Sequence, residues 1–478
     1  MTDLQIRPQG APAGPTNRQV RPGLLLALVL SGQFMAVLDI SVVNVAVPTI
    51  RTDLHATGAG LQLVIAGYTI AYAVLLITGA RLGARYGYSR LFRYGLAVFT
   101  GASLACGLAP STGTLIAFRI AQGVGAAVMV PQVMSLVQRT FTGAARTRAL
   151  GFYSAVLAGG MAVGQVVGGL LVSADLFGTG WRPVFLVNVP LGLVLLAASA
   201  RLLPSLPGDS SRGFDIPGLV VLAAALGTLV VPLVLGHELG WPAWGWAMLA
   251  ASALLFGVFG LVERRISARG GQPLVPGRVL RAPGLLPAAG AIFLIMAGFS
   301  GFMFAFALHQ QAGLGHSALR AGLLSGPVAV GFGLSSLHWQ RLPKLLHRPL
   351  PVLALALMAP AYAGLGLLLG DGGEIGLLAE VLLTLAGFAA GCAYSPLFGR
   401  ALGKVDPADA ADGSGVMVTI VQLGQVVGVS LLGTVFLGQV SYPAGAAASG
   451  GAFLVTCAAI AGGFAAAALF AGRTRRAV

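Results

Sequence analysis

The sequence predicts an all-α polytopic membrane protein with two six-helix bundles, an inserted helix pair and both termini in the cytoplasm. Of its 478 residues, 56% are hydrophobic and only 9% are charged, whereas a soluble domain carries about 25% charged residues. A bilayer solvates the apolar side chains that a soluble fold would have to bury. The apolar residues also form runs long enough to span a bilayer, separated by short basic loops.

Apolar runs separated by charged, proline or glycine residues predict the membrane-spanning helices in order. The fourteen predicted spans are 24–49, 61–80, 91–109, 113–137, 149–173, 183–203, 216–236, 243–262, 285–308, 319–338, 350–370, 376–398, 413–437 and 449–471. The first run is too long for a signal peptide and lacks a small-residue cleavage site, so we expect a retained helix.

The distribution of basic residues supports an even number of spans. With the N-terminus inside, only Arg51, Arg119, Arg182 and Arg320 of the 29 Lys and Arg residues fall outside the cytoplasmic segments. If one helix were removed from the count, every later loop would move to the opposite side of the membrane. The basic residues would then no longer be concentrated on the cytoplasmic side. The predicted parts are a tail at 1–22, a six-helix bundle at 23–204, a linker with two additional helices at 205–284, a second six-helix bundle at 285–472 and a tail at 473–478.

An internal repeat supports the same division. The fifth predicted helix contains the sequence GQVVGG at 164–169, and the thirteenth contains GQVVGV at 424–429. Without the inserted pair, each of these is the fifth helix of its half. Parallel repeats related by an axis along the membrane normal are one architecture of transporters.

Several classes of function are disfavoured. The net charge of +15 arises from short loops between apolar segments, so we expect no nucleic-acid partner. Cys106, Cys392 and Cys457 lie in apolar segments without metal or disulfide spacing. No phosphate-binding loop and no cluster of histidines or acids is present. We therefore expect no enzyme, no metal and no cofactor, with an ion gradient as the energy source.

Four stretches, at 38–48, 79–87, 119–127 and 181–190, resemble signatures of the fourteen-helix drug:proton antiporter branch of the major facilitator superfamily. The glycine-rich fifth helix is similar to the motif associated with exporters. The resemblance implies the major facilitator fold and alternating access in a bacterial inner membrane. It also implies proton-coupled multidrug efflux of lipophilic drugs, antibiotics or secondary metabolites. An importer of a small organic solute and a lipid flippase remain the alternatives.

The motifs predict a set of residues for gating. Glycines permit a tight turn after the second helix, and glycines every four residues let helices approach closely. The predicted gating and motif residues are Gly79, Gly83, Arg85, Gly87, Gly160, Gly164, Gln165, Gly168 and Gln425. The alternative interpretation is that the arginines only set topology and the glycines only pack helices.

The chain departs from the branch at three points. Ala84 stands where an acidic residue is usual, Tyr88 and Ser89 replace a basic pair, and Gln165 replaces a proline. A latch that uses the acidic residue and a kink at the proline are both in doubt.

Asp39 and Glu380 are the acids that fall inside predicted spans. A charged side chain there costs about 2.5–3.5 kcal/mol on insertion scales, so each needs a partner or a function. We predict that Asp39, with Glu380 and the cation Arg119, couples transport to protons or contacts substrate; in the family, this arginine is linked to proton coupling. Alternatively, Asp39 is a structural hydrogen-bonding residue near the outer end of its helix, Arg119 forms a structural ion pair, and Glu380 faces a hydrated vestibule.

The binding cavity is expected between the two halves at the midplane. Its predicted lining residues are Asn44, Tyr68, Tyr72, Gln122, Phe302 and Phe306. Aromatic walls with few polar groups suit a small lipophilic or amphipathic substrate, although aromatic residues that face lipid are the alternative. The expected partners are this substrate, protons and the bilayer, and we expect a monomer.

Overall fold

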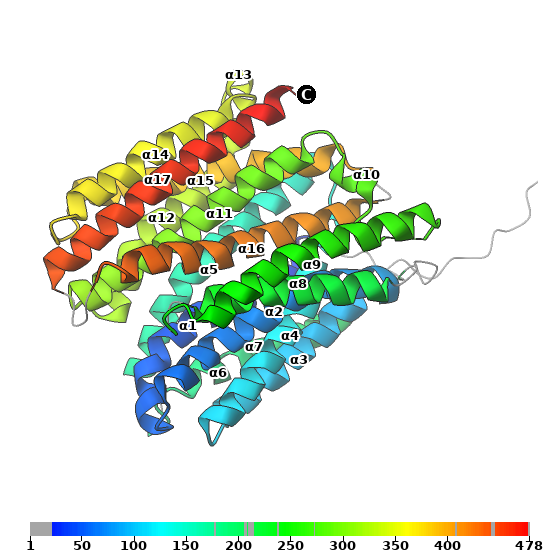
Figure 1. The fold of residues 1–478 in the computed structure, drawn as a ribbon. Helices are drawn as coiled ribbons and strands as arrows, with labels where there is room; N and C mark the ends of the chain where they lie inside the picture. The colour runs from blue at the N-terminus through cyan, green and yellow to red at the C-terminus, as the bar shows by residue number, and fades with distance from the viewer. Residues whose placement is uncertain are drawn as a thin grey trace, which may run out of the picture.

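The computed structural model describes residues 22–175, 178–204, 208, 215–236, 239–271, 273–406, 409–440 and 445–476. The predicted N-terminal tail therefore lies outside the described residues, apart from Pro22. The described part is built from helices that run side by side (Figure 1). The fold class predicted from composition, an all-α polytopic membrane protein, is confirmed.

The first bundle contains the helices α1 to α7. They are α1 (Pro22–Asp53), α2 (Gly58–Tyr86), α3 (Tyr88–Gly107), α4 (Thr112–Thr140), α5 (Gly143–Ser173), α6 (Pro183–Leu186) and α7 (Asn188–Leu202). The sixth predicted span is divided at Val187. Pro190 explains the division, because a proline lacks an N–H and its ring clashes with the carbonyl four residues earlier, which is that of Leu186.

The remaining helices form the inserted pair and the second bundle. They are α8 (Ile216–Leu235), α9 (Ala243–Ala268), α10 (Gly277–Leu280), α11 (Leu285–Leu308), the π-helix η2 (His309–Gly313), α12 (Ala318–His338), the 3-10 helix η3 (Trp339–Arg341), α13 (Lys344–His347), α14 (Leu350–Leu369), α15 (Leu377–Gly403), α16 (Ala410–Leu437) and α17 (Ala446–Arg476).

Eleven helical segments among the described residues are long and apolar enough to span a membrane. The helices that cover the other three predicted spans, α3, α5 and α12, are not among these eleven segments of the described residues. The count of fourteen spans therefore stays a prediction.

Local sequence signals explain where several helices begin and end. Ser111 and Thr114 form a capping box at the start of α4, and the Thr57 hydroxyl accepts a hydrogen bond from Gly60 N at the start of α2. Gly87 separates α2 from α3 at a φ of 100°, a conformation that L side chains rarely adopt. This turn is the one that the glycine motif predicts.

Helix packing follows the internal repeat. In the first half α5 packs on α1, and in the second half α16 packs on α11. A Cβ added to Gly164 would lie 2.9 Å from Leu38 O, and one added to Gly428 would lie 2.1 Å from Ala297 O. The repeated glycines therefore bring the fifth helix of each half close to the first helix.

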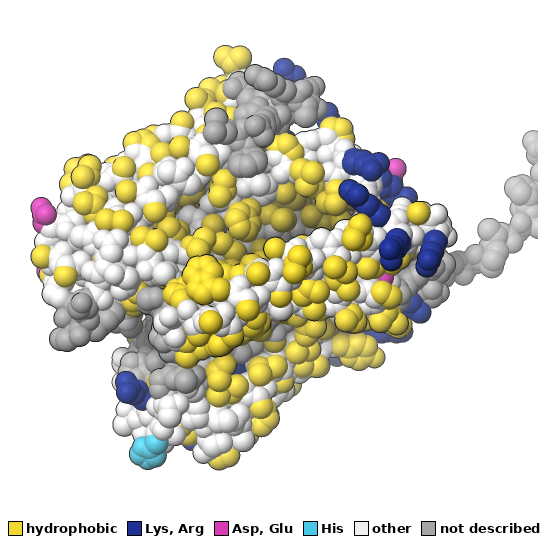
Figure 2. Space-filling model, in the orientation of Figure 1, with side chains coloured by type: hydrophobic (Ala, Val, Ile, Leu, Met, Phe, Trp, Pro, Cys, Tyr) yellow, Lys and Arg dark blue, Asp and Glu magenta, His cyan; other side chains and the backbone are white. Residues whose placement is uncertain are grey.

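The two bundles contact each other through α5 with α12 and α2 with α16. The inserted helices α8 and α9 pack on each other, and α8 also contacts α2 and α16. In Figure 1, the bundles approach each other at the end where α10 lies and diverge toward the opposite end. Figure 2 shows most of the visible Lys and Arg side chains gathered at the α10 end.

Candidate functional site

Asp39 on α1 and Arg119 on α4 form a buried ion pair between Asp39 Oδ2 and Arg119 Nη1. Each residue is only 1% exposed. Arg119 Nε also donates to Val64 O on α2 at 3.0 Å. With a rise of about 1.5 Å per residue, Asp39 lies near the middle of the 32-residue α1 rather than at its outer end. The site therefore joins three helices of the first bundle at mid-depth.

Two amides complete the hydrogen bonding of this pair. Gln122 Oε1 accepts from Arg119 Nη1 at 2.7 Å, while Gln122 Nε2 donates to Asp39 Oδ1 at 2.8 Å and to Ser103 Oγ at 2.7 Å. Asn188 Nδ2, at the start of α7, donates to Asp39 Oδ1 at 3.0 Å. Asp39 thus accepts from Arg119, Gln122 and Asn188. The sequence singled out Gln122 as a cavity residue, but Ser103 and Asn188 received no role.

Aromatic rings enclose the guanidinium of Arg119. Its Cζ lies 4.6 Å from the ring centroid of Tyr68 and 5.7 Å from that of Phe185. The Tyr68 hydroxyl donates to Ala36 O at 3.1 Å, so this ring is held between α1 and α2. A buried pair in such surroundings is costly to break, about 3–5 kcal/mol when one partner is removed.

A second polar contact joins the two bundles. Gln422 on α16 hydrogen-bonds through Nε2 to the hydroxyl of Tyr72 on α2. Tyr153 on α5 and Tyr394 on α15 belong to the same buried cluster as Tyr72, and α5 contacts α15 across the two bundles. The hydroxyls of Tyr394 and Ser395 have no hydrogen-bond partner among the described residues. These five residues form what we call the interface layer.

Of the five residues of the interface layer, only Tyr72 is among the cavity residues that the sequence predicts. The signal that could have added Tyr153 and Tyr394 is the presence of a hydroxyl inside an otherwise apolar helix, because burying a hydroxyl without a hydrogen-bond partner costs free energy. Both residues are nearly fully buried.

Phe302 and Phe306 lie inside the second bundle. Their rings stack with centroids 5.5 Å apart, and Phe302 also meets Tyr362 on α14 at 4.8 Å and Phe453 on α17 at 5.8 Å. α11 is apolar on every face, so its sequence does not tell which aromatics face the interface. The side chain of Asn44 lies outside the described part of the structure.

Glu380 lies apart from the buried pair, exposed in the first turn of α15. Glu380 is thus exposed where Asp39 is buried, and its part in proton coupling stays a prediction. The Glu380 carbonyl accepts from Thr384 Oγ1 at 2.9 Å, a contact within the helix that does not involve the carboxyl.

The predicted glycines of the second-helix motif make close helix contacts. A Cβ added to Gly79 would lie 2.0 Å from Ala127 O on α4, and one added to Gly83 would lie 1.9 Å from Gln132 Oε1. Arg85 lies over the ring of Tyr86, 5.6 Å from its centroid. The two glycines therefore let α2 approach α4 closely, whereas the contact of Arg85 lies within α2.

Gly160 and Gly164 of the fifth-helix motif face α1 in the same way. A Cβ on Gly160 would lie 2.9 Å from Val37 Cγ1, and Gly168 is buried. The carbonyl of Gln425 accepts from Ser300 Oγ on α11 at 2.9 Å. The side chain of Gln165 lies outside the described residues.

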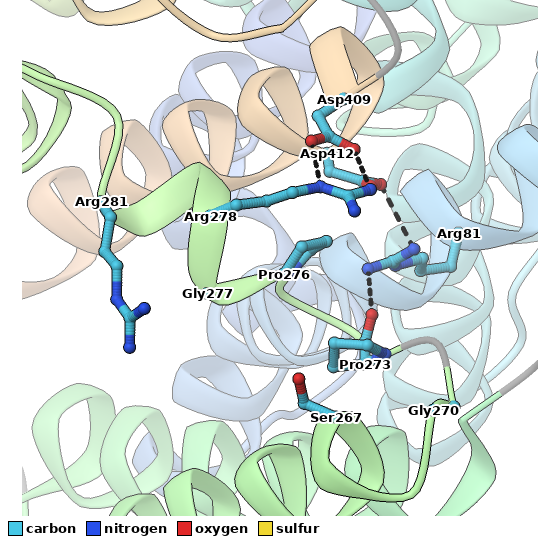
Figure 3. Close-up of a pocket in the computed structure, with 11 residues that line it drawn as sticks. Arg81, Ser267, Gly270, Pro273, Pro276, Gly277, Arg278, Arg281, Asp409 and Asp412 are labelled. Carbon is cyan, nitrogen blue, oxygen red and sulfur yellow. Dashed lines mark hydrogen bonds and ion pairs between the residues drawn. The ribbon is translucent and has the colours of Figure 1, made fainter.

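A polar cluster closes the α10 end of the bundles (Figure 3). Arg81 on α2 pairs with Asp412 on α16 at 3.2 Å and donates to Pro273 O at 3.0 Å. Arg278 on α10 pairs with Asp409 through two hydrogen bonds. These residues line a cavity of about 560 Å³.

The model of the Major Facilitator Superfamily matches residues 29–216 and 206–429. The chain is similar to a probable actinorhodin transporter of Streptomyces coelicolor, with 36% identity over 458 residues that cover 93% of this chain and 77% of that protein. It is also similar to the cephamycin export protein CmcT of Amycolatopsis lactamdurans, with 36% identity over 439 residues that cover 88% and 86%.

A third relative is the tetracenomycin C resistance and export protein of Streptomyces glaucescens, which is 32% identical over 460 residues, covering 92% of this chain and 80% of that protein. Among solved structures, the proton:xylose symporter XylE has a similar fold, with a TM-score of 0.63 at 14% identity and 94% of each chain covered.

Proposed function

This chain belongs to the major facilitator superfamily, and from that premise we propose that it is a proton-coupled antiporter that exports a small lipophilic antibiotic, drug or secondary metabolite. It is a multi-pass membrane transporter, and the bacterial relatives described above are named as transporters or export proteins. The proposal places it in the bacterial inner membrane with fourteen spans.

The observation that carries the proton coupling is the buried pair of Asp39 and Arg119. A proton that binds Asp39 removes the charge with which Arg119 is paired, and a buried cation without a partner is costly. Protonation therefore favours a rearrangement of α4 against α1. α1 packs on α5, and α5 contacts α12 of the other bundle, so this rearrangement is positioned to change how the bundles meet.

The composition of the interface layer supports the proposal that the substrate is lipophilic. It combines tyrosine rings with a few hydroxyl and amide groups contributed by both bundles. Sites for drug-sized molecules are mostly apolar and aromatic, with a small number of polar groups that set orientation. We propose that substrate contacts Tyr72, Tyr153, Tyr394 and Gln422 when the bundles separate.

The distribution of basic side chains indicates which end of the protein faces the cytoplasm. Lys and Arg side chains gather at the α10 end (Figure 2), and cytoplasmic loops carry an excess of basic residues. We therefore assign the α10 end to the cytoplasm. The bundles diverge at the other end (Figure 1), which corresponds to an outward-facing arrangement.

Transport into inverted membrane vesicles with an imposed pH gradient tests the proposal. An antiporter that exports its substrate accumulates it in inverted vesicles that are acidic inside, and collapse of the gradient stops this accumulation. Movement of substrate out of the same vesicles would indicate an importer. Lipid translocation that needs neither substrate nor a gradient would indicate a flippase.

A further inference from the structure

The segment between α9 and α11 contacts both bundles at the α10 end. Arg81 of the first bundle donates to Pro273 O at 3.0 Å and also pairs with Asp412 of the second bundle at 3.2 Å. One guanidinium therefore contacts α16 and the segment that follows the inserted helix pair (Figure 3).

A second ion pair holds the same segment to α16. Arg278 Nη2 donates to Asp409 Oδ1 at 2.7 Å, and Arg278 Nε donates to Asp409 Oδ2. The side chain of Asp409 is 5% exposed, whereas that of Arg278 is 74% exposed. Two parallel bonds from an arginine to a carboxylate fix orientation as well as distance, so this pair defines where α10 lies against the start of α16.

The inserted pair holds the segment from the opposite side. Glu263 on α9 accepts from Leu274 N at 3.2 Å and from Val275 N at 2.8 Å. The Leu274 side chain is buried in an apolar cluster with Leu222 and Leu226 of α8. The residues 273–278, which we call the clamp, are thus fixed to α8 and α9 as well as to both bundles.

We propose that the clamp, through Arg278 and Asp409, is a gate by which the inserted helix pair holds the cytoplasmic end closed. The inference rests on the proposed alternating access, in which the two bundles must separate at this end. The clamp bonds to α2 of one bundle and to α16 of the other, so that separation has to break at least one of these contacts. Arg278 and Asp409 act as positioning residues and do not contact substrate.

The test uses the full-length protein in proteoliposomes and a cysteine introduced by Ala80→Cys. Ala80 lies on α2 against α16, since a Cβ on Gly415 would lie 3.4 Å from Ala80 Cβ. The native cysteines Cys106, Cys392 and Cys457 are at most 2% exposed, and the same protein without Ala80→Cys measures their background. The readout is the rate of alkylation by a polar maleimide that reaches the cytoplasmic end.

Arg278→Glu should raise the alkylation rate several-fold. Arg281→Glu is the matched control, because Arg281 is exposed, lines the same cavity and has no ion-pair partner among the described residues. It should leave the rate unchanged. Arg278→Asp combined with Asp409→Arg should restore slow alkylation, which guards against a general loss of folding in the single variant.

Equal rates for Arg278→Glu, Arg281→Glu and the parent would overturn the proposal, and so would fast alkylation in the charge-swapped pair. The alkylation measurement needs no substrate and no proton gradient. If the alkylation rates agree with the proposal but the vesicle assay finds import, the gate is supported and only the export function is rejected.

Discussion

Arg119 and Asp39 are eighty positions apart in the chain, yet they form an ion pair that excludes solvent from both side chains. Gln122 contacts both members of the pair. A charge change at either residue therefore alters one connected network that joins α1, α4 and α7.

Removing one charge of the pair should destabilise the protein more than removing both. Arg119→Gln leaves the Asp39 carboxylate buried without its cation, at a cost of about 3–5 kcal/mol. Adding Asp39→Asn removes the unpaired charge, so the double variant should melt at a higher temperature than Arg119→Gln alone. Thermal unfolding in detergent measures this difference. A double variant whose melting temperature falls by the sum of the two single effects would show that the residues are not energetically coupled.

The repeated glycines should tolerate no side chain where helices touch. Gly428→Ala places a Cβ where it would lie 2.1 Å from Ala297 O, and overpacking of this kind costs about 1–3 kcal/mol. Gly462→Ala on α17 is the matched control, since nothing lies within 4 Å of its Cβ position. The control should be neutral or slightly stabilising, because alanine favours a helix. Equal melting temperatures for the two variants would refute the close contact.

Asp53 should contribute to stability in a pH-dependent way. Its carboxylate accepts from Arg182 Nη1 at 2.7 Å and from Trp181 Nε1 at 2.9 Å. These bonds hold the pKa of Asp53 below its usual value of 3.8. The contribution is therefore present above that value and is lost as the pH falls through the lower pKa of the folded state.

The effect of Asp53 should be small, because its side chain is 45% exposed. Asp53→Asn should lower the melting temperature slightly at neutral pH, and the difference from the parent should shrink as the pH falls below 3.8. A difference that grows on acidification would mean that the carboxylate does not stabilise the fold.

The interface layer should determine substrate affinity. Gln422→Leu removes the hydrogen bond to Tyr72 and should raise the KM for transport while leaving the dependence on the pH gradient unchanged. Tyr362→Phe is a matched control, since Tyr362 is buried inside the second bundle among Phe302 and Phe464. An unchanged KM in Gln422→Leu would remove this residue from the substrate site.

Helices were predictable because hydrophobic run length and charge asymmetry are properties of the sequence. Helical residues extend beyond the predicted spans, as in α2 and α15, where the helix continues past residues 80 and 398 into segments with charges. Hydropathy marks where lipid ends, whereas backbone hydrogen bonding continues until a breaker such as Gly87. The break at Val187 follows from Pro190, a local signal inside an apolar run.

The candidate site was predictable only in part. The cost of burying charge identified Asp39 and Arg119, and the structure brings them together. Their partners Asn188 and Ser103 are short polar residues of a kind that is common in membrane helices, and although Asn188 lies in the signature stretch 181–190, its sequence position did not indicate a contact with Asp39. Tyr72 and Gln422 are 350 positions apart and contact each other across the two bundles. Their contact depends on how the bundles pack together, and this packing cannot be predicted from the sequence of either helix alone.

The most direct test of the central claim is proton release on substrate binding. Purified protein in detergent is mixed with candidate substrates while a pH-sensitive dye reports released protons, and Asp39→Asn is measured beside the parent after its folding has been verified. If Asp39 carries the coupled proton, the parent should release protons and Asp39→Asn should release none. Equal release by both proteins, or substrate binding by the parent without release, would contradict proton coupling at Asp39.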